Sequence, residues 1–316
     1  MTHGVYFCNS MSRNTLIVLL GPTASGKSAM AIRLAMYYRT EIVSADSRQV
    51  FRELNKGTAK PADAELATVR HHLVNSHSIH DSLDAADYGR EARRIIDEIF
   101  RHQNIAILCG GSGLYIKAVL EGFDEMPAIP EGIRHSVASE AEAGGLGWLQ
   151  REVSRVDPDY YEVVDRQNPQ RLMRAVEVYR ASGVPFSEYR KKEKLLLPFK
   201  VIKIGLSPPR EQLYERIDQR MDDMIRDGLF EEAERFFPLR HLNALQTVGY
   251  QEIFGYLEGQ YDKTESIRLL KRNSRRYAKR QLTWFRRDAG IQWFLPEDWK
   301  GIVRHIEHST SEKDHS

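Results

Sequence analysis

The chain has 316 residues, of which 41% are hydrophobic and 28% are charged, a composition typical of a soluble globular protein. Its formal net charge of +2 excludes a globally basic nucleic-acid binder, so such a partner must be sought in local charge clusters. Two distant cysteines, Cys8 and Cys109, exclude a disulfide framework and a cysteine-based zinc site. We expect a cytoplasmic protein, because no apolar run is long enough for a membrane span or a signal peptide.

The first predicted element follows an N-terminal tail, residues 1–12. Residues 15–20, TLIVLL, form a continuous apolar run that is typical of a strand buried on both faces of a parallel sheet. From Ser28 onward the apolar residues recur at helical spacing. Residues 41–47 form a second strand with a polar end.

The alternation of strands and helices continues along the chain. Residues 86–101 form an amphipathic helix, residues 105–109 a third strand, and residues 201–206 a further strand before a long helix. This order predicts an α/β fold, a doubly wound parallel sheet built around a phosphate-binding loop.

The pattern changes near Asp124, where MPAIPEG reads as a turn-rich boundary and helices without strands follow. We therefore expect a core domain of residues 13–124 and 199–305. A helical insertion domain, residues 125–198, interrupts it. Residues 306–316 are expected to form a C-terminal tail.

The segment GPTASGKS lies between the first strand and the first helix and has the form G-x-x-x-x-G-K-[ST]. In such loops several backbone N–H groups and the helix dipole face one anion. Lys27 would add a mobile cation, and the Ser28 hydroxyl would bind Mg²⁺. The loop indicates a diphosphate or a triphosphate without choosing between them, so a nucleoside kinase stays possible on this motif alone. The predicted diphosphate contacts are Gly21, Pro22, Thr23, Ala24, Ser25, Gly26, Lys27 and Ser28.

Polar residues follow the second and third predicted strands, at the sheet edge where ligands bind in doubly wound folds. Asp46 is the only carboxylate of the stretch SADSRQ. It is a candidate general base, a candidate Mg²⁺ group, or a helix N-cap. The glycine-rich stretch 110–113 either brings backbone and the Ser112 hydroxyl close to a ligand or forms a plain turn.

A basic stretch, residues 267–287, contains no acidic residue. As a helix it would gather arginines and a lysine on one face, which suits the phosphate backbone of RNA. The alternative is a solvated surface helix, which usually mixes in acidic residues. In the insertion, Arg171 and Arg174 lie one turn apart and form a second RNA candidate, with Arg134 as a further one. The residues of the basic face are Arg268, Arg272, Arg275, Arg276 and Lys279.

Several further motifs occur in a recognisable order. They are SADSRQVF (44–51), GTAKP (57–61), HHL (71–73), GGSGLY (110–115), NPQRLMRAVEVY (168–179), TVGYQE (247–252) and KRQLTWFRR (279–287). Together with the phosphate loop they make the chain resemble bacterial tRNA dimethylallyltransferases, the tRNA isopentenyltransferases. The resemblance runs from about Leu16 to Trp293, nearly the whole chain.

The resemblance implies transfer of a dimethylallyl group from dimethylallyl diphosphate to N6 of adenosine 37 in tRNAs that read codons beginning with U. The products are N6-(dimethylallyl)adenosine and diphosphate, and Mg²⁺ assists. By the same resemblance Asp46 is the general base, Arg220 lies near the diphosphate, and Ser112 stands where the family usually has Thr. The expected partners are the tRNA anticodon stem-loop and the allylic donor, with no membrane, and the expected state is a monomer.

The predicted tRNA contacts combine the family motifs with the basic residues. They are Asp46, Ser47, Arg48, Gln49, Ser112, Arg134, Gln170, Arg171, Leu172, Met173, Arg174, Gly249, Tyr250, Arg275, Arg276, Lys279, Arg280, Gln281 and Trp284.

The sequence also departs from the family pattern. Val74 and Asn75 follow HHL where the family often has an acid, so His71 and His72 receive no role. From the cysteine count we expect no C-terminal zinc finger of the kind that eukaryotic members carry. Three alternatives stay open: an adenylate prenyltransferase acting on AMP, a P-loop kinase, and an RNA-binding module with a vestigial loop.

Overall fold

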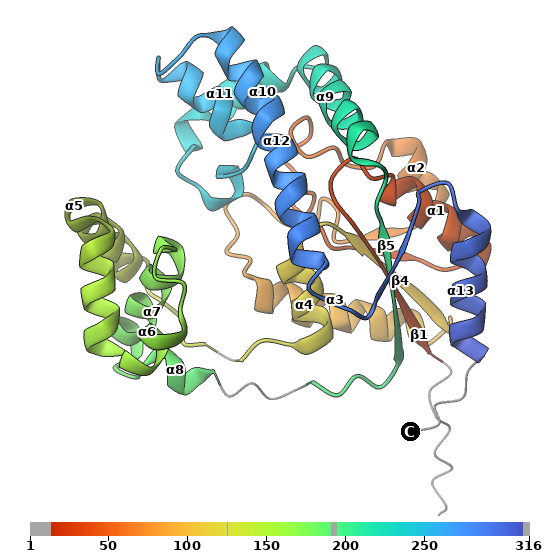
Figure 1. The fold of residues 1–316 in the computed structure, drawn as a ribbon, viewed down its shortest axis with the longest axis horizontal. Helices are drawn as coiled ribbons and strands as arrows, with labels where there is room; N and C mark the ends of the chain where they lie inside the picture. The colour runs from red at the N-terminus through yellow and green to blue at the C-terminus, as the bar shows by residue number, and fades with distance from the viewer. Residues whose placement is uncertain (1–13, 125, 191–194, 312–316) are drawn as a thin grey trace, which may run out of the picture. The chain divides into compact units, whose positions relative to one another are not determined.

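The computed structural model describes residues 14–124, 126–190 and 195–311, and Figure 1 shows its fold. The predicted N-terminal tail, residues 1–12, lies outside this range. The chain divides into two compact units: residues 1–120 with 196–316, and residues 121–195. The insertion was expected at residues 125–198, so the second unit begins four residues earlier and ends three residues earlier than expected.

The first unit, the core unit, is built on a six-stranded parallel sheet with the order β3-β2-β4-β1-β5-β6. This confirms the predicted α/β doubly wound fold. The two edge strands, β3 and β6, were not predicted, because two and four residues are too short to show a pattern. The strands are β1 (Thr15–Leu20), β2 (Ile42–Ser44), β3 (His71–His72), β4 (Ile105–Gly110), β5 (Lys200–Leu206) and β6 (Ile291–Phe294).

Both faces of the sheet are buried, which explains the continuous apolar run of β1. Leu16 and Val18 point into one apolar cluster, and Ile17 and Leu19 into the other. Helices α3 (Ala85–Phe100) and α4 (Gly113–Glu121) cover the first face, and α1 (Lys27–Tyr38) covers the second. The short helix α2 (Asp63–Thr68) precedes β3.

Helix α13 (Trp299–Ser311) packs beside α1 and corrects one expectation. The C-terminal tail was expected from residue 306, but the helix continues to Ser311. Its side chains Ile302 and Ile306 are fully buried against the sheet, and this apolar stripe stabilises the last turns.

Four further helices of the core unit follow β5 and pack together beyond its carboxyl end in Figure 1. They bury apolar residues of α9, α10, α11 and α12 in the same cluster as α3 and α4. The basic stretch is helical as predicted from residue 267 to 285, within the longest of the four, and its last two residues follow the helix. They are α9 (Arg210–Arg226), α10 (Leu229–Phe236), α11 (Tyr250–Leu257) and α12 (Lys263–Phe285), with 3₁₀ turns at Phe237–Leu239 and Asn243–Leu245.

The described residues of the second unit form helices and connecting loops without a strand, as the sequence predicted. Its helices enclose their own apolar core, to which Val137, Leu149 and Leu172 contribute. Helix α5 bends at Gly145, whose φ of 63° is accessible to glycine. The helices are α5 (Glu131–Val156), α6 (Pro158–Val163), α7 (Pro169–Ser182) and α8 (Phe186–Tyr189).

Candidate active site

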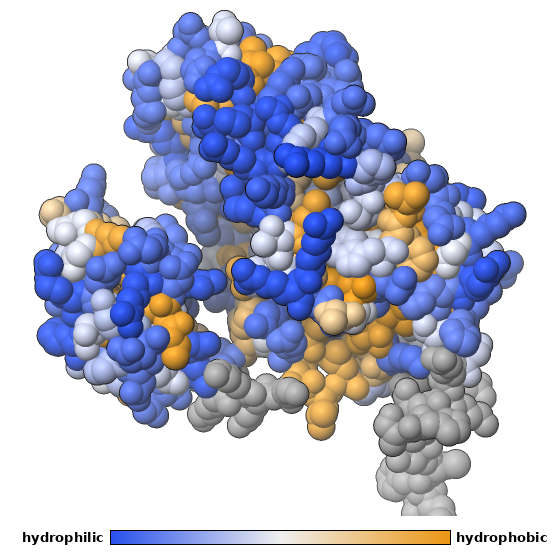
Figure 2. Space-filling view, viewed as in Figure 1, coloured by the Kyte–Doolittle hydropathy of each residue, from blue (hydrophilic) through white to orange (hydrophobic). Residues whose placement is uncertain are grey.

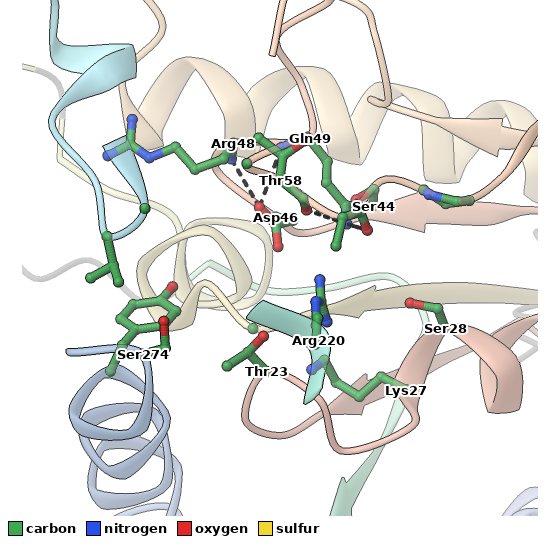
Figure 3. A pocket seen from close by; sticks show the side chains of 18 of the residues that line it. Thr23, Lys27, Ser28, Ser44, Asp46, Arg48, Gln49, Thr58, Arg220 and Ser274 are labelled. Atoms are coloured by element: carbon green, nitrogen blue, oxygen red, sulfur yellow. Dashed lines mark hydrogen bonds between the residues drawn. The ribbon is translucent and has the colours of Figure 1, made fainter. Parts of the chain in front are cut away.

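A pocket in the core unit lies at the carboxyl ends of β1, β2 and β4, where doubly wound folds bind their ligands. The phosphate loop, the turn after β2, the loop at 57–61 and helices α9 and α12 all contribute to its wall. Figure 3 shows the polar side chains that meet there. Nine of the predicted site residues line this pocket: Thr23, Lys27, Ser28, Asp46, Arg48, Gln49, Arg220, Gly249 and Gln281.

The phosphate loop has the backbone geometry that its glycines predict. Gly26 has a φ of 88° and caps α1, which begins at Lys27. Gly21 lies so close to β5 that a Cβ there would be 2.6 Å from the carbonyl oxygen of Leu206. The first N–H groups of α1 have no partner within the helix, so the loop and the helix together present donors to an anion.

Two cations enter the pocket beside this loop. Burial lowers the pKa of Lys27 to about 8, although Asp46 and Cys109 favour its charged form. The Lys27 amine donates to the carbonyl oxygen of Pro22 at 2.6 Å, which holds it over the loop. Burial also lowers the pKa of Arg220, and the charge of Asp46 opposes this. In Figure 3 Lys27 and Arg220 lie together, facing Asp46.

The Ser28 hydroxyl lies on the exposed first turn of α1 and lines the pocket. Asp46 is the one carboxylate among the described lining residues. Within residues 14–124, 126–190 and 195–311, no three His, Cys, Asp or Glu side chains gather to hold a metal ion. Mg²⁺ keeps waters and often binds through one or two protein oxygens plus substrate phosphates, so this donor set fits it only together with a phosphate ligand.

Asp46 uses its two carboxylate oxygens differently. Oδ1 accepts hydrogen bonds from the backbone N–H groups of Arg48 at 2.9 Å and Gln49 at 3.3 Å. The other oxygen points into the pocket on the side of Arg220 in Figure 3. Asp46 therefore caps a turn rather than a helix. One oxygen stays available for chemistry, and the role of base remains a prediction.

The turn that carries Asp46 is also held by Ser112. The Ser112 hydroxyl accepts a hydrogen bond from the Ser47 N–H at 2.9 Å, and the Ser112 N–H donates to the carbonyl oxygen of Ala45 at 3.1 Å. Ser112 is not among the residues that line the pocket. Its hydroxyl positions the turn in this structure, which differs from the catalytic contact that the sequence suggested.

Arg48 and Gln49 connect the same turn to two other segments. The Arg48 guanidinium donates to the carbonyl oxygens of Asn243 at 2.9 Å and Ala244 at 3.2 Å. The Gln49 amide donates to the carbonyl oxygen of Ala59 at 3.0 Å. Both side chains, predicted to contact tRNA, are engaged inside the core unit.

Gln281, predicted to contact tRNA, connects α12 to the phosphate loop. Its amide oxygen accepts from the Thr23 N–H at 2.9 Å, and its amide nitrogen donates to the carbonyl oxygen of Gly111 at 2.9 Å. Because the side chain is buried and both ends of its amide are hydrogen-bonded, Gln281 supports the phosphate loop in this structure.

The side chains of two further predicted tRNA contacts, Tyr250 and Leu172, are fully buried in this structure. Tyr250 donates its hydroxyl to Glu232 at 2.6 Å inside the core unit. Leu172 belongs to the apolar core of the second unit. Gly249, next to Tyr250, does line the pocket, and its N–H donates to Glu252 at 2.7 Å.

The basic face of α12 is divided between internal ion pairs and exposed cations. Arg275 pairs with Asp218 of α9 at 2.6 Å, and Lys271 pairs with Asp222 of α9 at 2.6 Å. These acids come from another helix, so reading α12 alone could not reveal them. Arg268 pairs with Glu265 in the first turn of α12.

The cations that remain on α12 lie on its outer side. Arg276, Lys279 and Arg280 are exposed and have no ion pair within the described part of the chain. Figure 2 shows hydrophilic residues over the surface where α12 runs in Figure 1. Trp284, at 38% exposure, extends this surface beside Gly113.

The second unit presents the remaining predicted tRNA contacts. Arg134, Gln170 and Arg171 are exposed, whereas Met173 and Arg174 are half-buried. Arg174 lies 3.7 Å from Glu177 of the same helix.

Comparison with known proteins agrees with this site. Residues 49–288 match the family model described as IPP transferase. The chain belongs to the IPP transferase family. The family resemblance inferred from the motifs is thereby confirmed.

Relatives of this IPP transferase cover nearly its whole length. The tRNA dimethylallyltransferase of Cytophaga hutchinsonii is 49% identical over 297 residues, which are 94% of this chain and 98% of the relative. That of Christiangramia forsetii is 45% identical over 295 residues, covering 93% and 98%. The solved tRNA isopentenylpyrophosphate transferase of Bacillus halodurans is 34% identical, with a TM-score of 0.68 and coverage of 94% and 95%.

Sequence reasoning missed an apolar part of the pocket in this IPP transferase. It consists of side chains from α9 and the start of α10, which in the sequence resemble ordinary core positions of amphipathic helices. The motifs GTAKP and HHL were noted in the sequence without a role, and TVGYQE supplied two predicted tRNA contacts. Residues of all three motifs line the pocket. The apolar residues, here called the apolar wall, are Ile217, Met221, Met224 and Leu229.

No helix among the described residues of this IPP transferase combines the length and the apolar character needed to cross a membrane.

The titration of Lys27 should make pyrophosphate binding depend on pH. Burial lowers its pKa to about 8, so below pH 8 the amine is charged and attracts the anion. Above pH 8 the free protein must take up a proton to bind, and the affinity should fall by up to about tenfold per pH unit. Calorimetric titration with inorganic pyrophosphate and Mg²⁺ across this range measures the effect.

Pyrophosphate also titrates, so the Lys27→Met variant serves as the control. The wild-type profile should fall more steeply than that of the variant above pH 8. Parallel profiles would contradict a role of the Lys27 charge in binding.

Proposed function

We propose that this IPP transferase moves a dimethylallyl group from dimethylallyl diphosphate to N6 of adenosine 37 in tRNAs that read codons beginning with U. The products are N6-(dimethylallyl)adenosine and diphosphate. The observation that carries the proposal is one pocket in which Asp46 faces the phosphate loop and two cations, Lys27 of that loop and Arg220 of α9. The likeness to relatives named tRNA dimethylallyltransferase over 94% of this chain supports it.

The leaving diphosphate would lie on the phosphate loop. The loop N–H groups, Lys27 and Arg220 would stabilise the negative charge that grows as the carbon–oxygen bond breaks. We propose Mg²⁺ as cofactor, held by the Ser28 hydroxyl and the phosphate oxygens of the donor. When bound it would neutralise part of the same charge. Because both protein cations are half-buried, water screens their attraction for the diphosphate less than it would at the open surface.

The acceptor is a weak nucleophile, since the lone pair of the N6 amine is delocalised into the adenine ring. The Asp46 oxygen that faces the pocket would accept the amine proton as the carbon–nitrogen bond forms. Its other oxygen is held by the N–H groups of Arg48 and Gln49, so the carboxylate keeps one orientation. The allylic carbon gains nitrogen and loses the diphosphate oxygen, and the proton passes to Asp46.

The apolar wall offers a place for the five-carbon chain of the donor. Ile217, Met221, Met224 and Leu229 lie in the same pocket as Lys27 and Arg220. Apolar side chains there would exclude water from the allylic carbon and so disfavour hydrolysis of the donor.

The exposed cations of α12 would contact the tRNA anticodon stem-loop, with Gln170 and Arg171 of the second unit as a further contact. The adenine must leave the base stack to reach Asp46, at a cost of a few kcal/mol. An enzyme acting on free AMP would gain nothing from the exposed row Arg276, Lys279 and Arg280. We propose that a monomer acts, since one chain supplies every part of the pocket.

Two neighbouring arginines of α12 should respond differently to neutralisation. Arg276→Ala should reduce the slope of log Kd for tRNA against log salt by about 1, because a phosphate contact is lost. Arg275→Ala should leave the slope near the wild-type value, because that guanidinium is paired with Asp218. Filter binding at several salt concentrations gives both slopes. An unchanged slope for Arg276→Ala would refute this surface as the RNA contact.

Asp46→Asn should separate donor binding from transfer. Asn keeps an oxygen for the N–H groups of Arg48 and Gln49 but loses the base, so kcat should fall by about 10²- to 10⁴-fold. Pyrophosphate affinity should not weaken. Transfer of labelled dimethylallyl groups to tRNA and calorimetric titration measure the two quantities.

The control is Asp63→Asn, the same change at an exposed carboxylate of α2, which should behave as the wild type. Normal turnover by Asp46→Asn would show that Asp46 only caps its turn.

A further inference from the structure

Glu232, on α10, is a charged side chain that lies outside the pocket and is only 2% exposed. Its Oε1 accepts hydrogen bonds from the N–H groups of Lys56 at 2.8 Å and Gly57 at 3.1 Å, and from the Tyr250 hydroxyl at 2.6 Å. Its Oε2 accepts from the Asn55 N–H at 3.1 Å. One buried carboxylate therefore gathers four donors, three of them successive backbone N–H groups.

The chain is shaped closely around this carboxylate. A Cβ at Gly57 would lie 2.6 Å from the ring of Tyr250, so glycine alone lets the two pack in this way. Successive N–H groups that face one point form a concave anion site. Tyr250 is fully buried and contributes the fourth donor. Since water has little access, Glu232 satisfies N–H groups that would otherwise be buried without partners.

The segment that Glu232 holds continues into the wall of the active-site pocket. Gly57, the last of the three N–H donors, lines the pocket together with the next two residues, Thr58 and Ala59. The carbonyl oxygen of Ala59 accepts from the Gln49 amide at 3.0 Å. The backbone N–H of Gln49 in turn donates to Oδ1 of Asp46 at 3.3 Å. A continuous set of contacts thus runs from Glu232 through the loop at 55–59 to Asp46.

We propose that Glu232 is a positioning residue of the transfer reaction: it fixes the loop at 55–59 and, through Gln49, the turn that orients Asp46. This inference rests on the function proposed above. Glu232 touches neither the diphosphate site nor the exposed cations of α12. Its effect should therefore fall on the rate of transfer and not on the binding of pyrophosphate.

Glu232→Gln is a nearly isosteric change that tests this role. Every partner of the carboxylate is a donor, and an ionised carboxylate only accepts. The glutamine amide would turn its own NH₂ group against at least one of these donors. With so little exposure no water can relieve that clash, so the loop at 55–57 must shift.

The experiment compares Glu232→Gln with Glu231→Gln, the same change at the exposed neighbour on α10. Transfer of labelled dimethylallyl groups to tRNA gives kcat, calorimetry gives Kd for pyrophosphate, and hydrogen exchange reports the amides of residues 55–57. For Glu232→Gln we expect kcat to fall about 10- to 100-fold, faster exchange at 55–57, and an unchanged pyrophosphate Kd. Glu231→Gln should match the wild type in all three.

A folded Glu232→Gln protein whose kcat equals that of Glu231→Gln would overturn the inference, as would a fall in kcat matched by lost pyrophosphate binding. If Glu232→Gln does not fold, Tyr250→Phe replaces it, since it removes one donor and leaves the three N–H bonds. We expect its kcat to fall about two- to fivefold with pyrophosphate Kd unchanged, and an unchanged kcat overturns the proposal. A wild-type protein that transfers nothing to tRNA would instead overturn the proposed function.

Discussion

The turn that follows β2 holds Asp46 by one carboxylate oxygen, through the backbone N–H groups of Arg48 and Gln49. Because β2 ends after three residues, this turn leaves the sheet beside the phosphate loop. Ser112 holds it from the loop after β4. Arg48 ties it to the segment near residue 243, and Gln49 ties it to the loop at 57–61. Several separate parts of the chain thus fix one carboxylate, and the proposed chemistry depends on its position.

The two cations of the pocket also determine which ligand it favours. Lys27 and Arg220 are half-buried, and burial lowers the pKa of both. Two partly desolvated positive charges without an anion between them cost free energy, so the pair favours a diphosphate ligand over an empty pocket. Asp46 lies near enough to favour the charged form of both groups. Asp218 and Asp222 of α9 lie on either side of Arg220 in the sequence. Asp218 pairs with Arg275 of α12 and Asp222 pairs with Lys271, so these ion pairs fix the helix that carries Arg220.

The sequence was informative where a feature is local. The phosphate loop and the buried strand before it each occupy a few consecutive residues, and both were predicted. Asp46 was also singled out, but the second strand was predicted over residues 41–47, whereas β2 ends at Ser44 and a turn follows. Features that join distant segments left no local pattern: Gln281 reads as part of a basic stretch, yet it supports the phosphate loop from 258 positions away. Likewise Asp218 neutralises Arg275 from another helix, and β3 is too short to show a period. Glu232 looks like any acid of an amphipathic helix until its burial is known.

The central claim is that this pocket joins an allylic diphosphate to an adenosine of tRNA. Mass spectrometry of nucleosides tests it most directly, on tRNA incubated with the protein, dimethylallyl diphosphate and Mg²⁺ and then digested. The account predicts one dimethylallyl group on the adenosine at position 37, absent when the protein is omitted. No gain on any tRNA under conditions in which the protein is folded, or a product on free AMP alone, would contradict it.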